Sequence, residues 1–461
     1  MLIRRSGVVM AAGCFSLLGL LAVGGWAGKR EQESRAAHQH VSQERLRTTL
    51  QKLGEFGKNP EGGVSRVGFT EADLAGRAYG IGLMREAGLA VRVDPAGNIF
   101  GRRPGSQDLP VLLFGSHIDS VPHGGNYDGD VGSLGAIEVI RALNEEHLAT
   151  RHPLEVVIWS NEEGGRFYSG LFGSSAAAGV LPADIGARQD ENGEKLSDWL
   201  SRMGGDAYRI ASAKIAPGSV SGYLELHIEQ GAVLDEAKVP IGVVTGIVGI
   251  SLRTCTVMGF ANHAGTTPMN RRKDALAAAS RAVRGEVRGE PGSQVGTVGW
   301  MKVEPGASNV IPGRVTFPVE LRDLHKEKID RIAARILQRF EVIGREENVQ
   351  ISCGTPDFDA PALTATPFQT AIRSSAHEAG LATLDLPSGA GHDAQNAAHF
   401  APVGMIFVPS RGGISHSPLE YTSPEQVANG TEVLYRSLLK LDAELDGEGA
   451  AHQDKSLPWR E

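Results

Sequence analysis

The sequence predicts an α/β fold in which a domain with a mainly parallel sheet is interrupted by a smaller inserted domain. Residues 41–244 alternate helical and strand-like patterns, and the same alternation resumes from residue 356. Between these stretches, residues 245–355 follow the order β-α-β-β-α-β. Alternating helices and strands are typical of α/β domains, so a change of pattern between two such stretches indicates an insertion.

The elements of the first stretch are predicted in chain order. Residues 70–88 form an amphipathic pattern that predicts a helix, and short strands are expected at 91–93 and 111–114. Asp130 is expected to cap a helix over residues 131–148, because its carboxylate can accept free amides of the first turn. A further strand, at residues 156–159, has a continuous apolar run, as expected for a strand that is buried on both faces.

The inserted stretch predicts a ferredoxin-like unit, with four strands and two helices on one face. Its elements are expected, in order, as strand 247–258, helix 273–287, strand 295–303, strand 315–321, helix 326–343 and strand 349–353. Pro318 lies inside one of these strands. Because proline cannot donate a ladder hydrogen bond, we expect this strand at an edge.

Composition excludes some classes of protein. The chain has 461 residues and a net charge of −8, so a nucleic-acid footprint is not expected. Its three cysteines lie far apart without a CxxC pattern, which suggests neither a thiolate zinc site nor a disulfide framework. We expect Cys255 to be a small buried residue rather than a reactive thiol.

The ends of the chain differ from its body. Residues 1–28 have a basic start and an apolar middle, which resemble an export signal and are long enough to anchor the chain in a bilayer. We therefore expect a periplasmic, secreted or membrane-anchored protein that contacts a membrane only through this segment. The alternative is a mis-assigned start and a cytoplasmic protein. The chain then divides into a first part of the larger domain, the insertion, a second part and a polar tail: 29–244, 245–355, 356–445 and 446–461.

Four segments place metal-binding side chains just after apolar, strand-like runs. They read VLLFGSHIDS with NYDGD following, VVIWSNEEG, YLELHIEQG and MIFVPSRGGISH. The side chains concerned are His117, Asp128, Glu162, Glu163, His227 and His416. Ligands of open α/β sheets bind beyond the carboxyl ends of the strands, so this set predicts a two-metal hydrolase.

Each residue type suits a different role at such a centre. Two metals about 3.5–4 Å apart need a bridging carboxylate, for which Asp128 is the candidate, while the three histidines would be terminal ligands. Asp119, two residues after His117, is expected to orient that imidazole. Glu162 and Glu163 cannot point the same way on an extended segment, so one would bind metal and the other would face the reacting water. The histidines without such context are expected at the surface: His38, His40, His147, His152, His377 and His399.

A family resemblance extends over residues 45–440. The segments HIDSVP with NYDG, WSNEEGGRF, LELHIEQG, GFANHAGTTPMNRRKDAL, SNVIPG, LRD, SGAGHDA and GGISHSP together resemble the hydantoinase/carbamoylase branch of the aminoacylase and carboxypeptidase-type di-zinc hydrolases. That branch contains N-carbamoyl-L-amino acid hydrolases, β-ureidopropionases and allantoate amidohydrolases. The resemblance implies cleavage of a ureido (N-carbamoyl) group, next to a carboxylate, to an amine, ammonia and carbon dioxide.

The resemblance also assigns the roles at the centre. One metal would be held by His117, Asp128 and His227, and the other by Asp128, Glu163 and His416. Glu162 would then be the general base and Asp119 the residue behind His117. Zinc is favoured, with manganese, cobalt and nickel as alternatives, because all four accept His and carboxylate ligands.

The inserted domain resembles the family's dimerisation lid. In a homodimer, His263 would reach the partner subunit's site and stabilise the oxyanion. The other side chains that would contact the substrate are Gln230, Asn309, Arg322 and His392. An arginine fork suits a carboxylate, whereas the alternatives are a salt bridge of Arg322 with Asp323 or another surface acid, and a capping or core role for His263. The lid would close about hinges near residues 245 and 355.

Two rival functions are weighed against this one. An aminoacylase or dipeptidase of the wider family would cleave an ordinary amide, and His227, Gln230 and Arg322 argue against it. A non-catalytic ureide-binding protein, tethered by its amino terminus, would need no base, yet Glu162 and all five ligands are present.

Overall fold

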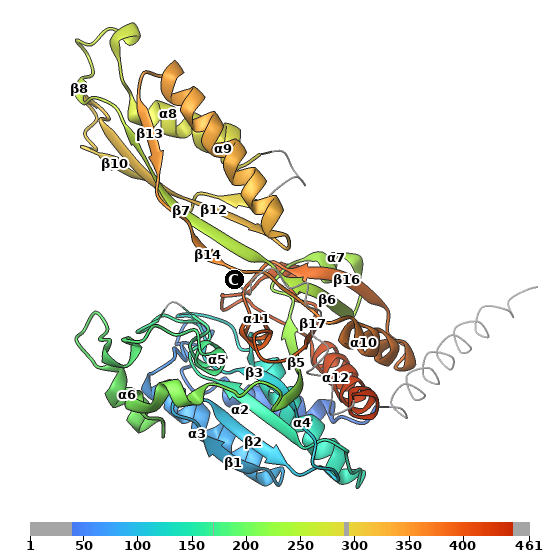
Figure 1. Ribbon diagram of the computed structural model, residues 1–461. Helices are drawn as coiled ribbons and strands as arrows, with labels where there is room; N and C mark the ends of the chain where they lie inside the picture. Colours follow the sequence, from blue (N-terminus) through green and yellow to red (C-terminus); the bar gives the residue numbers. More distant parts are fainter. Residues whose placement is uncertain (1–38, 169, 290–294, 446–461) are drawn as a thin grey trace, which may run out of the picture.

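The computed structural model describes residues 39–168, 170–289 and 295–445, which form a body and a projecting lid (Figure 1). The expected signal or anchor at 1–28 and the polar tail at 446–461 lie outside the described residues. Among the described helices, none combines the length and the hydrophobicity that crossing a bilayer requires.

The body is built on a mixed, mainly parallel sheet that has nine strands in the described part of the chain. Its order is β1-β2-β4-β3-β5-β17-β6-β15, and β16 pairs with β6. Its strands are β1 (Ala90–Val93), β2 (Ile99–Arg103), β3 (Val111–His117), β4 (Leu154–Trp159), β5 (Val220–Ile228), β6 (Ile241–Ile247), β15 (Ala362–Leu363), β16 (Thr383–Ser388) and β17 (Val403–Val408). The neighbouring strands β4, β3, β5 and β17 are parallel and buried along their whole length, which confirms the fold class.

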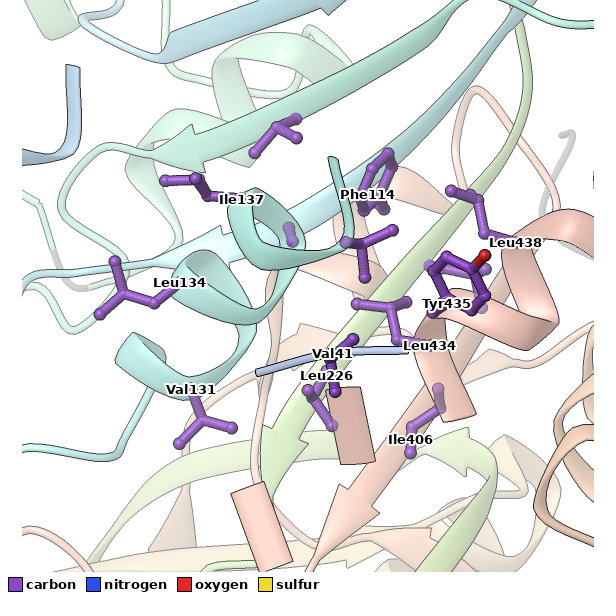
Figure 2. Close-up of a cluster of buried hydrophobic side chains, with 14 of the residues drawn as sticks. Val41, Phe114, Val131, Leu134, Ile137, Leu226, Ile406, Leu434, Tyr435 and Leu438 are labelled. Atoms are coloured by element: carbon purple, nitrogen blue, oxygen red, sulfur yellow. The ribbon is translucent and has the colours of Figure 1, made fainter. Parts of the chain in front are cut away.

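Helices cover both faces of this sheet. They are α2 (Gln43–Leu53), α3 (Glu71–Glu86), α4 (Asp130–Glu145), α5 (Phe172–Ala178), α6 (Leu196–Arg202), α7 (Val233–Ala237), α10 (Thr366–Glu378), α11 (Asp393–Ala397) and α12 (Pro424–Glu444), with short 3-10 turns η1 (Ile185–Ala187), η2 (Ala207–Ala213) and η5 (Arg411–Gly413). Figure 2 shows the core on one face, where Leu134 of α4 and Leu434 of α12 lie in one buried cluster with Phe114 and Leu226 of the sheet. The helix expected from residue 70 is α3, and the Thr70 hydroxyl accepts the backbone amide of Asp73 as its N-cap.

The lid is a separate antiparallel sheet with two helices packed on it. The sheet order is β10-β12-β7-β13, with β14 on β7 and β9 on β12. The elements are β7 (Gly249–Met258), β8 (Asn262–His263), η3 (Met269–Arg271), α8 (Ala275–Ala282), η4 (Val283–Val287), β9 (Val295–Thr297), β10 (Lys302–Glu304), β11 (Val310–Ile311), β12 (Arg314–Asp323), α9 (Lys326–Glu346), β13 (Gln350–Cys353) and β14 (Asp357–Asp359). The strand expected over 295–303 is therefore two short strands, which pair with opposite ends of β12.

Pro318 does not lie on an edge strand, contrary to expectation. It sits in β12, opposite Thr254 of the neighbouring strand β7. On its other side, β10 pairs with residues 314–316 and β9 with residues 320–322, so the ladder has a gap around Pro318. The missing N–H falls where no strand needs it, which explains how an interior strand accommodates proline.

The cysteine and histidine expectations need two corrections. Cys255 and Cys353 lie opposite each other on β7 and β13 and form a disulfide across 98 residues of sequence. His152 is buried rather than at the surface, with Nδ1 3.0 Å from the Asp442 carboxylate of α12. Both pairings depend on contacts between distant segments, which local sequence patterns do not contain.

Two adjacent crossings join the lid to the body. The chain leaves β6 and enters β7 through Val248, and it returns between β14 and β15 at residues 360–361. The crossings lie side by side, because β14 pairs with β7 and β15 pairs with β6. This double connection is where a relative motion of lid and body would be absorbed.

Candidate metal centre and active site

The ends of neighbouring parallel strands bring the expected ligands together. His117 is the last residue of β3, His227 lies near the end of β5, and Glu163 follows β4. Asp128 precedes helix α4, and His416 lies in the loop after β17. Because parallel strands end at one edge of the sheet, these side chains converge although they span 300 residues of sequence.

The two oxygens of the Asp128 carboxylate face two different groups of candidate ligands. Its Oδ1 lies 3.1 Å from Nε2 of His227 and 3.7 Å from Nε2 of His117. Its Oδ2 lies 3.3 Å from Nε2 of His416, and that nitrogen lies 3.3 Å from Oε2 of Glu163. Each trio has its ligand atoms within 4.8 Å of one another, so Asp128 has the position of a bridging ligand.

The residues fit a pair of divalent cations. Among the described residues, Nε2 of His117 and Oε1 of Glu163 are buried without a hydrogen-bond partner, and both atoms belong to members of the two trios. Burial, with nearby Asp128 adding to it, raises the pKa of Glu163 well above its ordinary value. Burial acts in the same direction on Asp128, but His227 and His416 outweigh it and hold the pKa of Asp128 well below its ordinary value. Crowded buried carboxylates beside unpaired imidazole nitrogens are the donors that such cations satisfy.

Glu162 and Glu163 are directed to different partners. Glu163 faces His416, whereas Oε2 of Glu162 lies 3.6 Å from Nε2 of His117. Glu162 is buried, and burial together with the charge of Asp393 raises its pKa well above the ordinary value. A carboxyl group in this setting readily takes up and holds a proton.

Asp119 acts on the glutamate pair more directly than on His117. Its two carboxylate oxygens accept the backbone amides of Glu162 and Glu163, each at 3.0 Å. Nδ1 of His117 lies 3.1 Å from the backbone oxygen of Asp119, and 3.7 Å from the carboxylate that was expected to orient it. Asn161, with φ of 49°, provides the turn that presents both amides to Asp119.

Two of the expected substrate residues lie at the centre. Gln230 follows β5 with φ of 59°, and its amide nitrogen donates to Oδ2 of Asp128 at 2.7 Å. His392 is the N-cap residue of α11, and its buried ring lies 4.5 Å from the ring of His227. Nε2 of His392 is 2.9 Å from the hydroxyl of Ser388, which orients the ring.

The other three expected substrate residues lie in the lid. Arg322 donates to the backbone oxygen of Gly389 in the body and to Glu320, both at 2.7 Å. The salt bridge expected as its alternative role is therefore present, with Glu320 as the acid, while Asp323 pairs with Lys328. His263 in β8 pairs with Val310 in β11, at the end of the lid that is remote from the large sheet (Figure 1). Asn309 lies beside His263, since its backbone oxygen accepts the amide of Ala264. A single chain therefore does not bring His263 and Asn309 to the metal ligands.

A buried ion pair that supports the centre escaped sequence analysis. Arg66 is fully buried and makes a bidentate contact with Asp130, at 2.6 and 2.8 Å. Its Nε donates to the backbone oxygen of Ile118, next to His117. Asp130 is the first residue of α4 and makes no side-chain cap, so its expected capping role is wrong. The sequence held no sign of this partner, which lies 64 residues earlier.

Two residues of the His416 loop were also missed. Ser415 donates to Oδ2 of Asp128 at 2.8 Å, and Glu420 accepts the backbone amide of Asp128 at 3.1 Å. Their closeness to His416 in sequence could have identified them, since both lie within four residues of it in the segment ISHSPLE.

The fold and this cluster define a metal-dependent hydrolase: a mainly parallel α/β sheet with two trios of ligands that share one aspartate. Residues 113–440 match Peptidase family M20/M25/M40. The chain is 44% identical over 404 residues to an N-carbamoyl-L-amino acid amidohydrolase of Geobacillus stearothermophilus, covering 87% of this chain and 99% of that one. It is 36% identical to the allantoate amidohydrolase of Bacillus subtilis, covering 85% and 96% of the two chains.

Solved structures agree with the sequence matches. An amidase of the hydantoinase/carbamoylase family from Burkholderia multivorans superimposes with a TM-score of 0.82 at 38% identity, covering 89% of this chain and all of that one. The chain belongs to the hydantoinase/carbamoylase amidases within Peptidase family M20/M25/M40. It is a metal-dependent amidohydrolase that acts on C–N bonds other than peptide bonds.

Proposed function

We propose that this enzyme hydrolyses the ureido group of a small, carboxylate-bearing substrate: an N-carbamoyl-L-amino acid, allantoate or β-ureidopropionate. The overall reaction takes R–NH–CO–NH2 and water to R–NH2, carbon dioxide and ammonia. The observation that carries the proposal is the buried carboxylate of Glu162 close to the two ligand trios that share Asp128. The chain that holds this arrangement is 44% identical to an N-carbamoyl-L-amino acid amidohydrolase.

Two divalent ions, when bound by the five ligands, supply a polarised carbonyl and a water molecule of lowered pKa. We propose zinc, with manganese, cobalt and nickel as alternatives. Glu162 takes the proton of the attacking water. Its buried position beside the candidate ligands suits it to hold that proton and deliver it to the departing nitrogen. Gln230 and His392, which already border the ligands, contact the ureido group.

Substrate specificity is assigned to the lid. Arg322 lies where the lid meets the body, and its guanidinium fork suits the substrate carboxylate. His263 and Asn309 are too remote to act in their own chain, which supports a homodimer in which His263 acts across the interface (Figure 1). Exposed apolar side chains in the lid, among them Phe260 and Trp300, are what a dimer interface would cover.

We also propose that residues 1–28 direct export or anchor the chain. The disulfide between Cys255 and Cys353 supports an oxidising compartment, where such bonds persist. Sequencing the amino terminus of the protein from its native source, with fractionation of the cells, tests this directly. A soluble cytoplasmic protein with reduced cysteines would contradict it.

Ammonia release from a panel of compounds tests the function. The panel contains N-carbamoyl-L- and D-amino acids, β-ureidopropionate, allantoate and N-acetyl-amino acids, each with added zinc or manganese. Metal-dependent ammonia release from one ureide supports the proposal and identifies the substrate. Free amine released only from N-acetyl compounds would identify an aminoacylase instead, and ureide binding without turnover would identify a binding protein.

A further inference from the structure

The carboxylate of Glu420 joins the two loops that carry Asp128 and His416. Its Oε1 accepts the backbone amides of Tyr127 and Asp128, at 2.9 and 3.1 Å. Glu420 is only 5% exposed, and it belongs to the loop that begins after β17 and contains His416. One carboxylate thus fixes the backbone of the bridging ligand relative to a terminal ligand that lies 288 residues later in sequence.

The second oxygen of Glu420 reaches the metal cluster through a serine. The hydroxyl of Ser415 lies 2.8 Å from Oε2 of Glu420 and 2.8 Å from Oδ2 of Asp128. This Oδ2 is the oxygen that faces His416, whereas Oδ1 faces His117 and His227. The contacts that run from Glu420 through Ser415 therefore end at the oxygen of Asp128 that belongs to the trio with Glu163 and His416.

The side chain of Glu420 packs closely against the backbone of Gly125. A Cβ on Gly125 would lie 2.0 Å from Oε1 of Glu420, so the carboxylate occupies the space where that side chain would be. The neighbours of the joined residues also touch: the rings of Tyr127 and Tyr421 pack edge to face, with centroids 5.6 Å apart. Both observations show that the two loops pack closely against each other.

We propose that Glu420, acting through Ser415 and the amide of Asp128, is a positioning residue for the metal held by Asp128, Glu163 and His416. It is not itself part of either ligand trio in the described residues. Residues that orient ligands in this way usually change metal affinity by about 10–100-fold when they are replaced. Because the contacts end at Oδ2, this metal should weaken more than the metal held by His117, Asp128 and His227. The inference rests on the metal centre of the proposed function.

Metal titration of the full chain tests this without an activity assay. Protein stripped by a chelator is titrated with Zn²⁺ by calorimetry and with Co²⁺ by visible absorption, for wild type, Glu420→Gln and Ser415→Ala. A glutamine keeps the shape but removes the negative charge, so the charge-assisted bonds to the backbone amides of Tyr127 and Asp128 are weakened. Asp442→Asn is the matched control, because Asp442 is a buried carboxylate that accepts two backbone amides, those of Arg151 and His152, away from the centre.

The wild type should bind two ions per chain. In Glu420→Gln, the ion held by Asp128, Glu163 and His416 should lose about 10–100-fold in affinity while the other changes little, and Ser415→Ala should show a smaller loss in the same direction. Unchanged affinities in Glu420→Gln, or an equal loss at both sites that Asp442→Asn reproduces, would overturn the proposal. Two ions bound with the expected asymmetry, but no ammonia released from any ureide, would remove the proposed function and leave this inference intact.

Discussion

Asp119 accepts the backbone amide of Glu162 at 3.0 Å, and its other oxygen accepts that of Glu163 at the same distance. One buried carboxylate thereby sets the orientation of both the candidate base and a candidate metal ligand. Since backbone amides cannot move apart without breaking this pair of bonds, the two glutamates are positioned as a unit.

Replacing Asp119 by asparagine should disturb both glutamates, because an amide has one acceptor oxygen for two backbone donors. We expect metal affinity to fall by about 10–100-fold, and kcat to stay reduced even at saturating metal, since Glu162 is displaced as well. Metal titration and kinetics of the same preparation measure both. Asp94→Asn, which removes a buried carboxylate that accepts the Asn98 amide, is the control. A wild-type kcat in Asp119→Asn at saturating metal would show that the contact does not position the base.

Arg322→Lys should weaken the recognition of the substrate carboxylate. A lysine keeps the charge but loses the bidentate fork, so KM should rise by about tenfold or more with a smaller change in kcat. Comparing each substrate with its carboxamide analogue isolates the effect, because the analogue has no carboxylate to lose. An equal rise in KM for both compounds would point instead to a structural role through the contacts of Arg322 with Glu320 and Gly389.

The disulfide should contribute substantially to the stability of the lid. Cys353→Ser removes a link between β7 and β13, and the free energy of unfolding should fall by about 2–4 kcal/mol. Denaturant unfolding with and without a reducing agent provides the measurement. Reduction should destabilise the wild type and leave Cys353→Ser unchanged; a wild type indifferent to reduction would contradict the bond.

The buried carboxyl of Asp73 should make stability depend on pH. Burial raises its pKa from 3.8 to about 6, although nearby Arg77 opposes this shift. A raised folded-state pKa contributes stability that is complete below about pH 4 and is lost as pH rises through about 6, up to about 3 kcal/mol for a shift of this size. Relative to Asp73→Asn, the wild type should therefore lose stability between about pH 4 and pH 7. Urea unfolding at the two pH values measures the difference, which would be constant if Asp73 did not titrate in this range.

The positions of most candidate metal ligands could be predicted from sequence because they follow apolar runs that end at one edge of a parallel sheet. His117, Glu163 and His227 need only the local pattern of their own strands to be placed. The pairing of Arg66 with Asp130 and that of Cys255 with Cys353 could not be predicted, since each depends on how distant segments pack. The same holds for Pro318, whose environment is set by where two other strands end.

We propose Glu162 as the base of a metal-dependent ureide hydrolase. The most direct test of this proposal follows ammonia release by wild type and Glu162→Gln, each stripped of metal and then restored with zinc or manganese. We expect restored wild type to release ammonia, and Glu162→Gln to bind the same two ions per chain while its turnover falls by about 10²–10⁴-fold. Turnover of Glu162→Gln at the wild-type rate would rule out Glu162 as the base, and ammonia release that survives removal of the metal would rule out a metal-dependent reaction.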